Sequence, residues 1–149
     1  MNPPATMRVL GVTLGDVTGI GPEVLVKALR ERHDPDTAWV VIGETAAWTQ
    51  AAGAVGFEAV LSRWPGRREA RPGLWFHSVS EETLPERMAP GAPEAARAAY
   101  GWLEAGGRLC AQGELDGIVT APVNKEAILR AGIPFVGQTE VVTAVAGHP

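Results

Sequence analysis

The chain has 149 residues and a formal net charge of −4, with 46% hydrophobic and 20% charged residues. This length suits one domain over residues 1–149 with a sizeable buried core, and the composition is that of a globular protein and not of a disordered one. The negative charge argues against a nucleic acid as partner, because phosphate binding needs a basic face. A single cysteine, Cys110, excludes an intrachain disulfide and a cluster of thiolate metal ligands.

The opening residues, MNPPATM, contain no apolar stretch of signal-peptide length. No segment of the sequence approaches the roughly 20 apolar residues that a membrane-spanning helix requires. We therefore expect a cytoplasmic protein that does not associate with a membrane.

Apolar periodicity predicts four strands, each followed by a helix. The first pair is a strand at residues 8–14 and, after a glycine-rich turn, a helix at 23–32 that begins behind Pro22. The later strand and helix pairs fall at 38–42 and 45–52, at 74–79 and 93–112, and at 115–120 and 125–131. This alternation indicates an α/β fold with a largely parallel sheet that is covered on both faces.

Two stretches fall outside these elements. Residues 62–73 hold two prolines, two glycines and four arginines, so we expect a surface loop whose basic side chains are solvated. Residues 133–149 are rich in β-branched residues and glycine, and no completed element is predicted there.

The longest predicted helix, 93–112, places one apolar face along its length. The residues of this face are Ala96, Ala99, Tyr100, Leu103, Gly107 and Cys110. Three glycines, Gly101, Gly106 and Gly107, should weaken the helix by up to about 1 kcal/mol each. Cys110 is expected in the core and not as a nucleophile, because buried thiols behave as small hydrophobic groups.

Two loops lie where α/β sheets bind ligands, beyond the carboxyl ends of strands. The first, Gly15 to Glu23, reads GDVTGIGPE, and its glycines would let the backbone approach an anion near the start of a helix. It matches neither the Gly-x-Gly-x-x-Gly nor the Gly-Lys-Ser/Thr phosphate loop. A ligand-binding loop and a plain glycine-rich turn that joins a strand to a helix both remain open.

The second loop, Thr120 to Lys125, reads TAPVNK. Asn124 is a candidate N-cap for the helix that follows. Lys125 at the start of that helix opposes the helix dipole, which an anionic partner would explain. A solvated lysine explains it equally well.

The histidines and tryptophans give weaker signals. His33, His77 and His148 have no Asp, Glu or Cys at ligand spacing, so no metal site is expected within the chain. His33 is expected at a helix end and His77 on a strand surface. The five tryptophans are scattered, which favours core and loop anchoring over a platform for stacking bases.

Both loops resemble motifs of the 4-hydroxythreonine-4-phosphate dehydrogenases of pyridoxal phosphate biosynthesis. The family loop Gly-Asp-Pro-Ala-Gly-Ile-Gly-Pro-Glu appears here with departures at Val17 and Thr18. The family stretch Gly-Glu/Leu-Asp-Ala-Ile-Val-Thr-Ala-Pro-Ile-Asn-Lys-Glu-Ala appears nearly unbroken as GELDGIVTAPVNKEA, residues 113–127. The spacing to the segment at residues 137–140, Gly-Gln-Thr-Glu, also fits the family.

The resemblance implies a three-layer α/β/α fold, similar to that of the isocitrate and isopropylmalate dehydrogenases. It also implies a homodimer with active sites in a cleft at the subunit interface. Members of the family oxidise a substrate hydroxyl with NAD and a divalent metal, and the keto acid then loses carbon dioxide. A metal would hold the reacting oxygens and stabilise the developing enolate.

The departures limit what this chain is expected to do. The family's Gly-His-Thr-Glu motif contains a substrate-binding threonine, which corresponds to Thr139 here. Gln138 occupies the position of the family's histidine. Glutamine can form hydrogen bonds but cannot carry a proton or a positive charge near neutral pH. The metal-binding histidines and the main nicotinamide contacts of the family lie beyond Pro149, so no cofactor is expected for this chain alone.

The sequence therefore predicts a truncated relative of these dehydrogenases that is inactive alone and has no assigned catalytic residue. Its partner would be a small phosphorylated hydroxy acid. The residues predicted to bind this substrate are Asp16, Asn124, Lys125, Gln138 and Thr139. Two alternatives remain: a phosphometabolite-binding or interaction module, and the N-terminal subunit of a split dehydrogenase.

Overall fold

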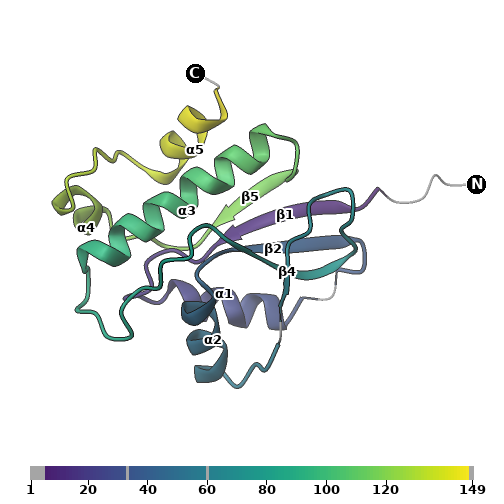
Figure 1. The fold of residues 1–149 in the computed structure, drawn as a ribbon, viewed down its shortest axis with the longest axis horizontal. Helices are drawn as coiled ribbons and strands as arrows, with labels where there is room; N and C mark the ends of the chain where they lie inside the picture. The colour runs from purple at the N-terminus through teal and green to yellow at the C-terminus, as the bar shows by residue number, and fades with distance from the viewer. Residues whose placement is uncertain (1–5, 33, 60, 148–149) are drawn as a thin grey trace, which may run out of the picture.

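Parallel strands form the centre of the fold in the order β3-β4-β2-β1-β5 (Figure 1). The computed structural model describes residues 6–32, 34–59 and 61–147. The strands are β1 (Arg8–Thr13), β2 (Thr37–Gly43), β3 (Ser62–Arg63), β4 (Gly73–Ser78) and β5 (Gly117–Thr120). The helices are α1 (Gly21–Arg30), α2 (Thr45–Ala54), α3 (Pro93–Ala111), α4 (Lys125–Arg130) and α5 (Gln138–Ala146).

The predicted alternation of strands and helices is confirmed, with ends that differ by a few residues. Every strand pairing is parallel, which agrees with the largely parallel sheet that the sequence predicted. The first helix begins at Gly21, with Pro22 at its start, because the fixed φ of proline suits a position where no N–H bond is needed. Within the described residues, no helix combines the length and apolar character that crossing a membrane requires.

Three layers build the fold. Helices α1 and α2 lie on one face of the sheet and α3 on the other, with α4 and α5 near α3 (Figure 1). One apolar cluster joins the sheet to α1, α2 and the sheet-facing side of α3, and includes Val40, Trp48 and Trp102. A second cluster joins α3 to the C-terminal segments through Leu103, Ile128 and other apolar residues. This arrangement confirms the α/β/α fold.

The tryptophans serve as core residues, as predicted. Trp39, Trp48, Trp64 and Trp102 are buried, and the indole N–H of Trp75 donates to the carbonyl of Arg71 at 2.9 Å. Large aromatic side chains of this kind contribute much of the apolar area that a core buries.

Helix α3 is buried on two sides, and the single predicted face is therefore wrong in part. Ala96 and Leu103 pack in the second cluster, whereas Trp102 and Ala105 pack against the sheet. A helix between two layers has a wide apolar surface, and one stripe cannot describe it. Cys110 is half-buried beside the first cluster, which supports its prediction as a packing residue.

The glycines of α3 allow close packing on both of these sides. A Cβ at Gly106 would collide with the side chain of Ile118 in β5. A Cβ at Gly107 would lie 3.2 Å from the carbonyl oxygen of Val142 in α5. A Cβ at Gly101, in contrast, would meet no atom within 4 Å. Gly106 and Gly107 are thus contact positions, although glycine lowers the intrinsic stability of a helix.

We expect opposite effects of alanine at two of these glycines. Gly101→Ala should raise the free energy of unfolding by about 0.5–1 kcal/mol, because alanine is the better helix former and the space is free. Gly106→Ala should lower it by about 1–2 kcal/mol, because Ile118 must move in a packed interior. Urea denaturation of both variants measures the difference. Equal effects of the two changes would contradict the contact at Gly106.

The sequence predicted no completed element at residues 133–149, and this prediction is wrong. Helix α5 forms there, with the sequence QTEVVTAVA. Its β-branched residues are weak helix formers, so local propensity does not indicate a helix there. Packing stabilises the helix despite its low intrinsic propensity, because Val142 and Val145 lie close to Gly107, which has no side chain. The helix ends at Gly147, whose φ of 75° is the left-handed conformation that glycine adopts easily at this position.

The loop predicted at residues 62–73 contains the short strand β3. One of its four arginines, Arg67, forms an ion pair and is not simply solvated. The Arg67 guanidinium lies 2.8 Å from a carboxylate oxygen of Asp116. The Arg67 backbone N–H donates to Glu114 at 2.7 Å, and Asp116 also accepts from the backbone N–H of Val9 at 2.8 Å. These bonds fasten the loop to the segment that precedes β5 and to β1. The predicted solvation still describes Arg63, Arg68 and Arg71, which are exposed.

Stability at acid pH should depend on Asp116. The hydrogen bond from Arg67, helped by the bond from Val9, holds the pKa of Asp116 below its usual value despite partial burial. A lowered folded-state pKa means that the stabilisation is present above the unfolded pKa of about 3.9 and is lost as the pH falls below it. We expect Asp116→Asn to lower the free energy of unfolding by about 1 kcal/mol near pH 7.

The test is urea denaturation of wild type and Asp116→Asn between about pH 3 and pH 7. The difference between the two proteins should stay constant above about pH 5 and shrink below about pH 4. Asp36→Asn, which changes an exposed carboxylate outside this network, is the matched control. A difference that grows on acidification would contradict the assignment.

Candidate functional site

Strand β1 is the point in the sheet at which the strand order reverses. From β1 the chain proceeds through α1 to β2 on one side, whereas α3 on the opposite face leads to β5 on the other side (Figure 1). Open α/β sheets bind ligands at the carboxyl ends of strands where the strand order reverses. The two predicted loops follow β1 and β5, so the fold brings both to this point.

The β1–α1 loop, residues 14–20, is organised by its own aspartate. The Oδ1 atom of Asp16 accepts hydrogen bonds from the backbone N–H of Thr18 at 2.8 Å and from its hydroxyl at 2.7 Å. Asp16 is only 7% exposed. The carboxylate therefore acts first as an internal brace of the loop.

The β5–α4 loop, residues 121–124, lies directly against the β1–α1 loop. The Asp16 backbone N–H donates to the carbonyl of Pro122 at 3.0 Å. Gly15 has a φ of 72°, and a Cβ there would collide with the same carbonyl oxygen. A Cβ at Gly21 would lie 2.8 Å from the carbonyl oxygen of Leu14. Glycine is thus required at position 15 both for its conformation and for the contact between the loops.

A third segment, which sequence reasoning missed, joins the two loops. The backbone N–H of Gly91, just before α3, donates to the hydroxyl oxygen of Thr18 at 2.9 Å. A Cβ at Gly91 would lie 2.9 Å from a nitrogen of Arg130 and 3.3 Å from the side-chain nitrogen of Asn124. The only signal in the sequence was a glycine shortly before a predicted helix, and that pattern is common in loops.

Asn124 and Lys125 begin α4 at this junction. The side-chain oxygen of Asn124 accepts from the backbone N–H of Ala127 at 3.0 Å, which confirms Asn124 as the N-cap. Its side-chain nitrogen points toward the segment of Gly91. Lys125 is exposed to solvent, and no salt bridge joins it to another described residue.

Gln138 and Thr139 occupy the first turn of α5, a separate element. Within the described residues, no hydrogen bond links either of them to the β1–α1 loop. The Gln138 side-chain oxygen is buried and has no hydrogen-bond partner among these residues. A buried acceptor of this kind normally bonds to another group, so a ligand or water molecule could satisfy it. Thr139 is exposed.

The described residues do not fit a metal site. No group of three or more His, Cys, Asp or Glu side chains among residues 6–32, 34–59 and 61–147 is placed to hold an ion. His33 and His148 lie outside the described residues. The glycine spacing of the β1–α1 loop also differs from that of a dinucleotide-binding loop.

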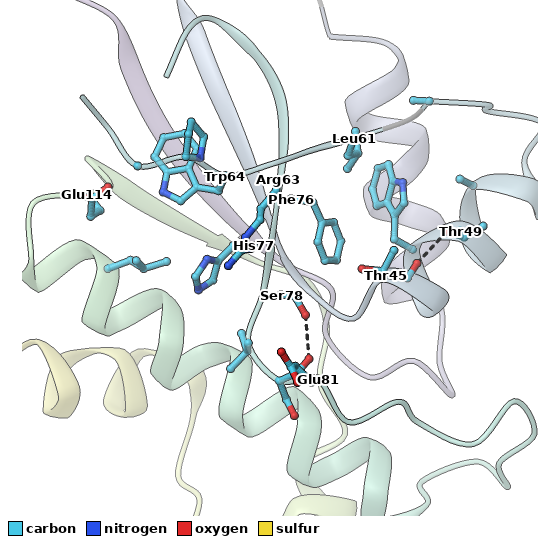
Figure 2. Close-up of a pocket in the computed structure, with 18 of the residues that line it drawn as sticks. Thr45, Thr49, Leu61, Arg63, Trp64, Phe76, His77, Ser78, Glu81 and Glu114 are labelled. Atoms are coloured by element: carbon cyan, nitrogen blue, oxygen red, sulfur yellow. Dashed lines mark hydrogen bonds between the residues drawn. The ribbon is translucent and has the colours of Figure 1, made fainter. Parts of the chain in front are cut away.

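A large groove of about 1270 Å³ lies elsewhere, around the edge of the sheet at β3 and β4 (Figure 2). Trp48, Phe57 and Phe76 line it together with Arg63 and His77. His77 lies on strand β4, as predicted, and is half-buried in this groove; burial, with the nearby Arg63 charge, lowers its pKa. None of the five predicted substrate-binding residues lines this groove. Among the described residues, the loop junction remains the candidate site, because it brings the residues of two motifs to the point where the strand order reverses.

The Cys110 thiol is a poor nucleophile in this setting. Burial, with a smaller contribution from the negative charge of Asp116, raises its pKa above the usual value. Because the thiolate is the reactive form, a raised pKa disfavours reaction.

Comparison with known proteins gives consistent matches along the chain. The family model described as pyridoxal phosphate biosynthetic protein PdxA matches residues 36–149. The D-threonate 4-phosphate dehydrogenase of Cupriavidus necator is 36% identical over 149 residues, which cover 96% of this chain and 44% of the relative. The 4-hydroxythreonine-4-phosphate dehydrogenase of Zymomonas mobilis is 36% identical over 151 residues, which cover 95% and 42%.

Solved structures agree with these sequence matches. The crystal structure of a 4-hydroxythreonine-4-phosphate dehydrogenase from Burkholderia phymatum superposes with a TM-score of 0.80 at 31% sequence identity. The match covers 96% of this chain and 44% of that structure. The chain thus spans less than half the length of the relatives it matches.

Proposed function

Because the chain belongs to the PdxA family of pyridoxal phosphate biosynthetic proteins, we propose that it forms the substrate-binding side of a dehydrogenase for 4-phosphorylated hydroxy acids. The substrate class is that of 4-hydroxythreonine 4-phosphate or D-threonate 4-phosphate, on which the named relatives act. The observation that carries the proposal is the junction of the two motif loops where the strand order reverses.

Each predicted residue has a distinct part in this proposal. Lys125 supplies a positive charge for the phosphate, since charge-assisted hydrogen bonds to phosphate are among the strong ones. Gln138 offers its unpartnered oxygen and Thr139 its hydroxyl to substrate hydroxyl groups. Asn124 and Asp16 hold the loop junction next to the ligand.

The described residues are proposed to give no turnover alone, and the remaining part of the family fold would supply the metal ligands and the nicotinamide site. Glutamine at position 138 cannot transfer a proton near neutral pH, unlike the histidine of the family motif. The proposal includes a homodimer as the assembled form. Its cellular location would be the cytoplasm.

The test combines turnover and binding on the 149-residue chain. With 4-hydroxythreonine 4-phosphate, NAD and either Mg²⁺ or Zn²⁺, we expect no NADH above a control without protein. Calorimetric titration with the same substrate should show saturable binding that Lys125→Ala weakens about tenfold, the size expected for one charge-assisted bond. Lys27→Ala, which removes the exposed lysine of α1, is the matched control and should leave the affinity unchanged.

Each readout can contradict a different part of the proposal. NADH formation well above the control would show that the chain carries a complete catalytic site. Absence of binding by the folded chain would remove the substrate-binding role, and an interaction module would then be the better description. Equal losses in Lys125→Ala and Lys27→Ala would contradict the placement of the phosphate.

A further inference from the structure

The groove at the β3–β4 edge lies apart from the loop junction. Strands β3 and β4 stand at one end of the sheet, whereas β1 and β5, whose loops form the junction, lie toward the other end. Its volume of about 1270 Å³ exceeds the roughly 300–1000 Å³ of typical small-molecule pockets, so a ligand of that size would occupy part of it. We call it the edge groove; its lining includes Trp48, Phe57, Arg63, Trp64, Phe76 and His77.

Aromatic side chains line the part of the edge groove next to α2. Trp48 comes from α2, Phe57 from the segment that follows this helix, and Phe76 from β4. Figure 2 shows Phe76 on the side of Thr45, the first residue of α2. Aromatic rings gain stacked or edge-to-face contacts with another ring beyond the area that they bury. This part of the groove therefore favours a ligand with an aromatic ring.

A cation and a hydrogen-bond donor lie beside these rings. Arg63 is the register partner of Phe76, and its side chain lies next to His77 (Figure 2). No salt bridge joins Arg63 to another described residue. Burial, and to a smaller extent the Arg63 charge, lowers the pKa of His77, and a neutral imidazole still has one N–H to donate. The two side chains together offer a place for an anionic group.

Two indole N–H groups in the lining of the edge groove lack an acceptor. Trp48 and Trp64 are 3% and 8% exposed, and neither indole N–H has a hydrogen-bond partner among the described residues. Buried polar groups normally have a partner, so an acceptor on a ligand or a water molecule could satisfy them. Both N–H groups are covered by protein atoms, and a ligand would reach them only with a small movement of the rings.

We propose that the edge groove binds a small aromatic anion, with its ring against Trp48, Phe57 and Phe76 and its anionic group beside Arg63 and His77. This site is separate from the proposed substrate site, because none of the five predicted substrate-binding residues lines the groove. An apolar lining with a few polar groups that fix the orientation of the ligand is the usual form of a small-molecule site.

The carboxylates of the groove do not oppose this placement. Glu114 already accepts a hydrogen bond from the backbone N–H of Arg67 at 2.7 Å. Glu58 and Glu81 are exposed, so water and salt screen their charges. The anionic group is therefore placed at the one arginine of the lining, Arg63, beside the half-buried His77.

A polypeptide segment, from this chain or from a second copy, fits the edge groove less well. Polar side chains surround the aromatic surface, among them Thr45, Thr49, Ser80 and Gln112. A helix or strand packed over the groove would bury these groups and the Arg63 charge, and burial without partners costs free energy. A small ligand leaves them in water.

Calorimetric titration of the 149-residue chain with naphthalene-2-carboxylate tests the proposal, and saturable binding is expected. Thr49→Trp adds a large ring at an exposed position of α2 that lines the groove. It should weaken binding by about tenfold or more, because the new ring fills the space of the ligand. Gln50→Trp adds the same ring at the next position of α2, which is exposed but does not line the groove, and should change the affinity by less than about twofold.

A second pair of variants tests the anionic group. Arg63→Gln should weaken binding by about fivefold, a moderate loss because this charge is exposed and screened. Arg68→Gln removes an exposed arginine outside the groove and should leave the affinity unchanged. Naphthalene-2-methanol has the same rings without the charge, and should bind wild type and Arg63→Gln equally.

Several outcomes would overturn the proposal, provided that circular dichroism shows each variant to be folded. Absence of saturable binding, or equal effects of Thr49→Trp and Gln50→Trp, would remove the ligand from the groove. Displacement of naphthalene-2-carboxylate by 4-hydroxythreonine 4-phosphate would place it at the loop junction. An affinity that falls as the concentration of the chain rises would indicate a second copy in the groove. An equal loss for both probes in Arg63→Gln would contradict the position of the anionic group.

Discussion

Replacing Gly15 with alanine is expected to lower the free energy of unfolding by about 3 kcal/mol and to abolish measurable substrate binding. Two effects combine. The φ of 72° is unfavourable for alanine, and the new Cβ would collide with the Pro122 carbonyl oxygen. This oxygen belongs to the backbone and cannot rotate away as a side chain could. The β1–α1 and β5–α4 loops must therefore move apart, and this movement disrupts the candidate site.

Comparison with Gly113→Ala separates the effect of the contact between the two loops from the effect of backbone conformation. Gly113 has a φ of 75°, nearly that of Gly15, but a Cβ there would meet no atom within 4 Å. It should lower the free energy of unfolding by about 1 kcal/mol through conformation alone and leave substrate binding intact. Urea denaturation and calorimetric titration measure both quantities. Similar losses in the two variants would refute the role of the loop contact.

Removing the Asp16 carboxylate with Asp16→Ala is expected to lower the free energy of unfolding by about 2 kcal/mol. The change leaves the backbone N–H and hydroxyl of Thr18 without their acceptor. It also frees the Thr18 hydroxyl to turn away from Gly91, which donates to it. All three segments of the junction should loosen, so substrate affinity should fall as well.

Asp16→Asn separates the bracing role from a direct role in binding. Asparagine retains a side-chain oxygen that can accept both bonds from Thr18, so its unfolding free energy should lie within about 1 kcal/mol of wild type. If Asp16 acts only as a brace, substrate affinity should also be retained. A large loss of affinity with normal stability would show that the carboxylate contacts the substrate directly. Equal destabilisation by alanine and asparagine would contradict the bracing bonds.

Much of the architecture could be predicted from local patterns. The period of the apolar residues located β1, β2, β4 and α1 to α3 within a few residues, because these elements alternate regularly and are long enough to show their period. The motif residues 15–23 and 113–127 identified the family, since their spacing is specific. The rule for parallel sheets places both loops at the same edge of the sheet on the basis of the sequence.

Weak local signals explain the elements that were missed. Strand β3 has two residues, too few to show a period, and exists because Arg63 and Ser62 pair with β4. Helix α5 has poor intrinsic propensity and depends on α3 for its packing. The basic run around Arg67 predicts a solvated side chain, because its partner Asp116 is 49 residues away in the sequence.

The alternation of strands and helices, the family, and the carboxyl-end position of the two loops follow from the sequence alone, because periodicity and short motifs are local properties. The coordinates were needed to show that Gly91 joins those loops, that α3 is buried on two sides, and that Arg67 pairs with Asp116. Each of these depends on contacts between residues far apart in the chain. Such contacts are selected by the packing of whole layers, and no local pattern of residues records them.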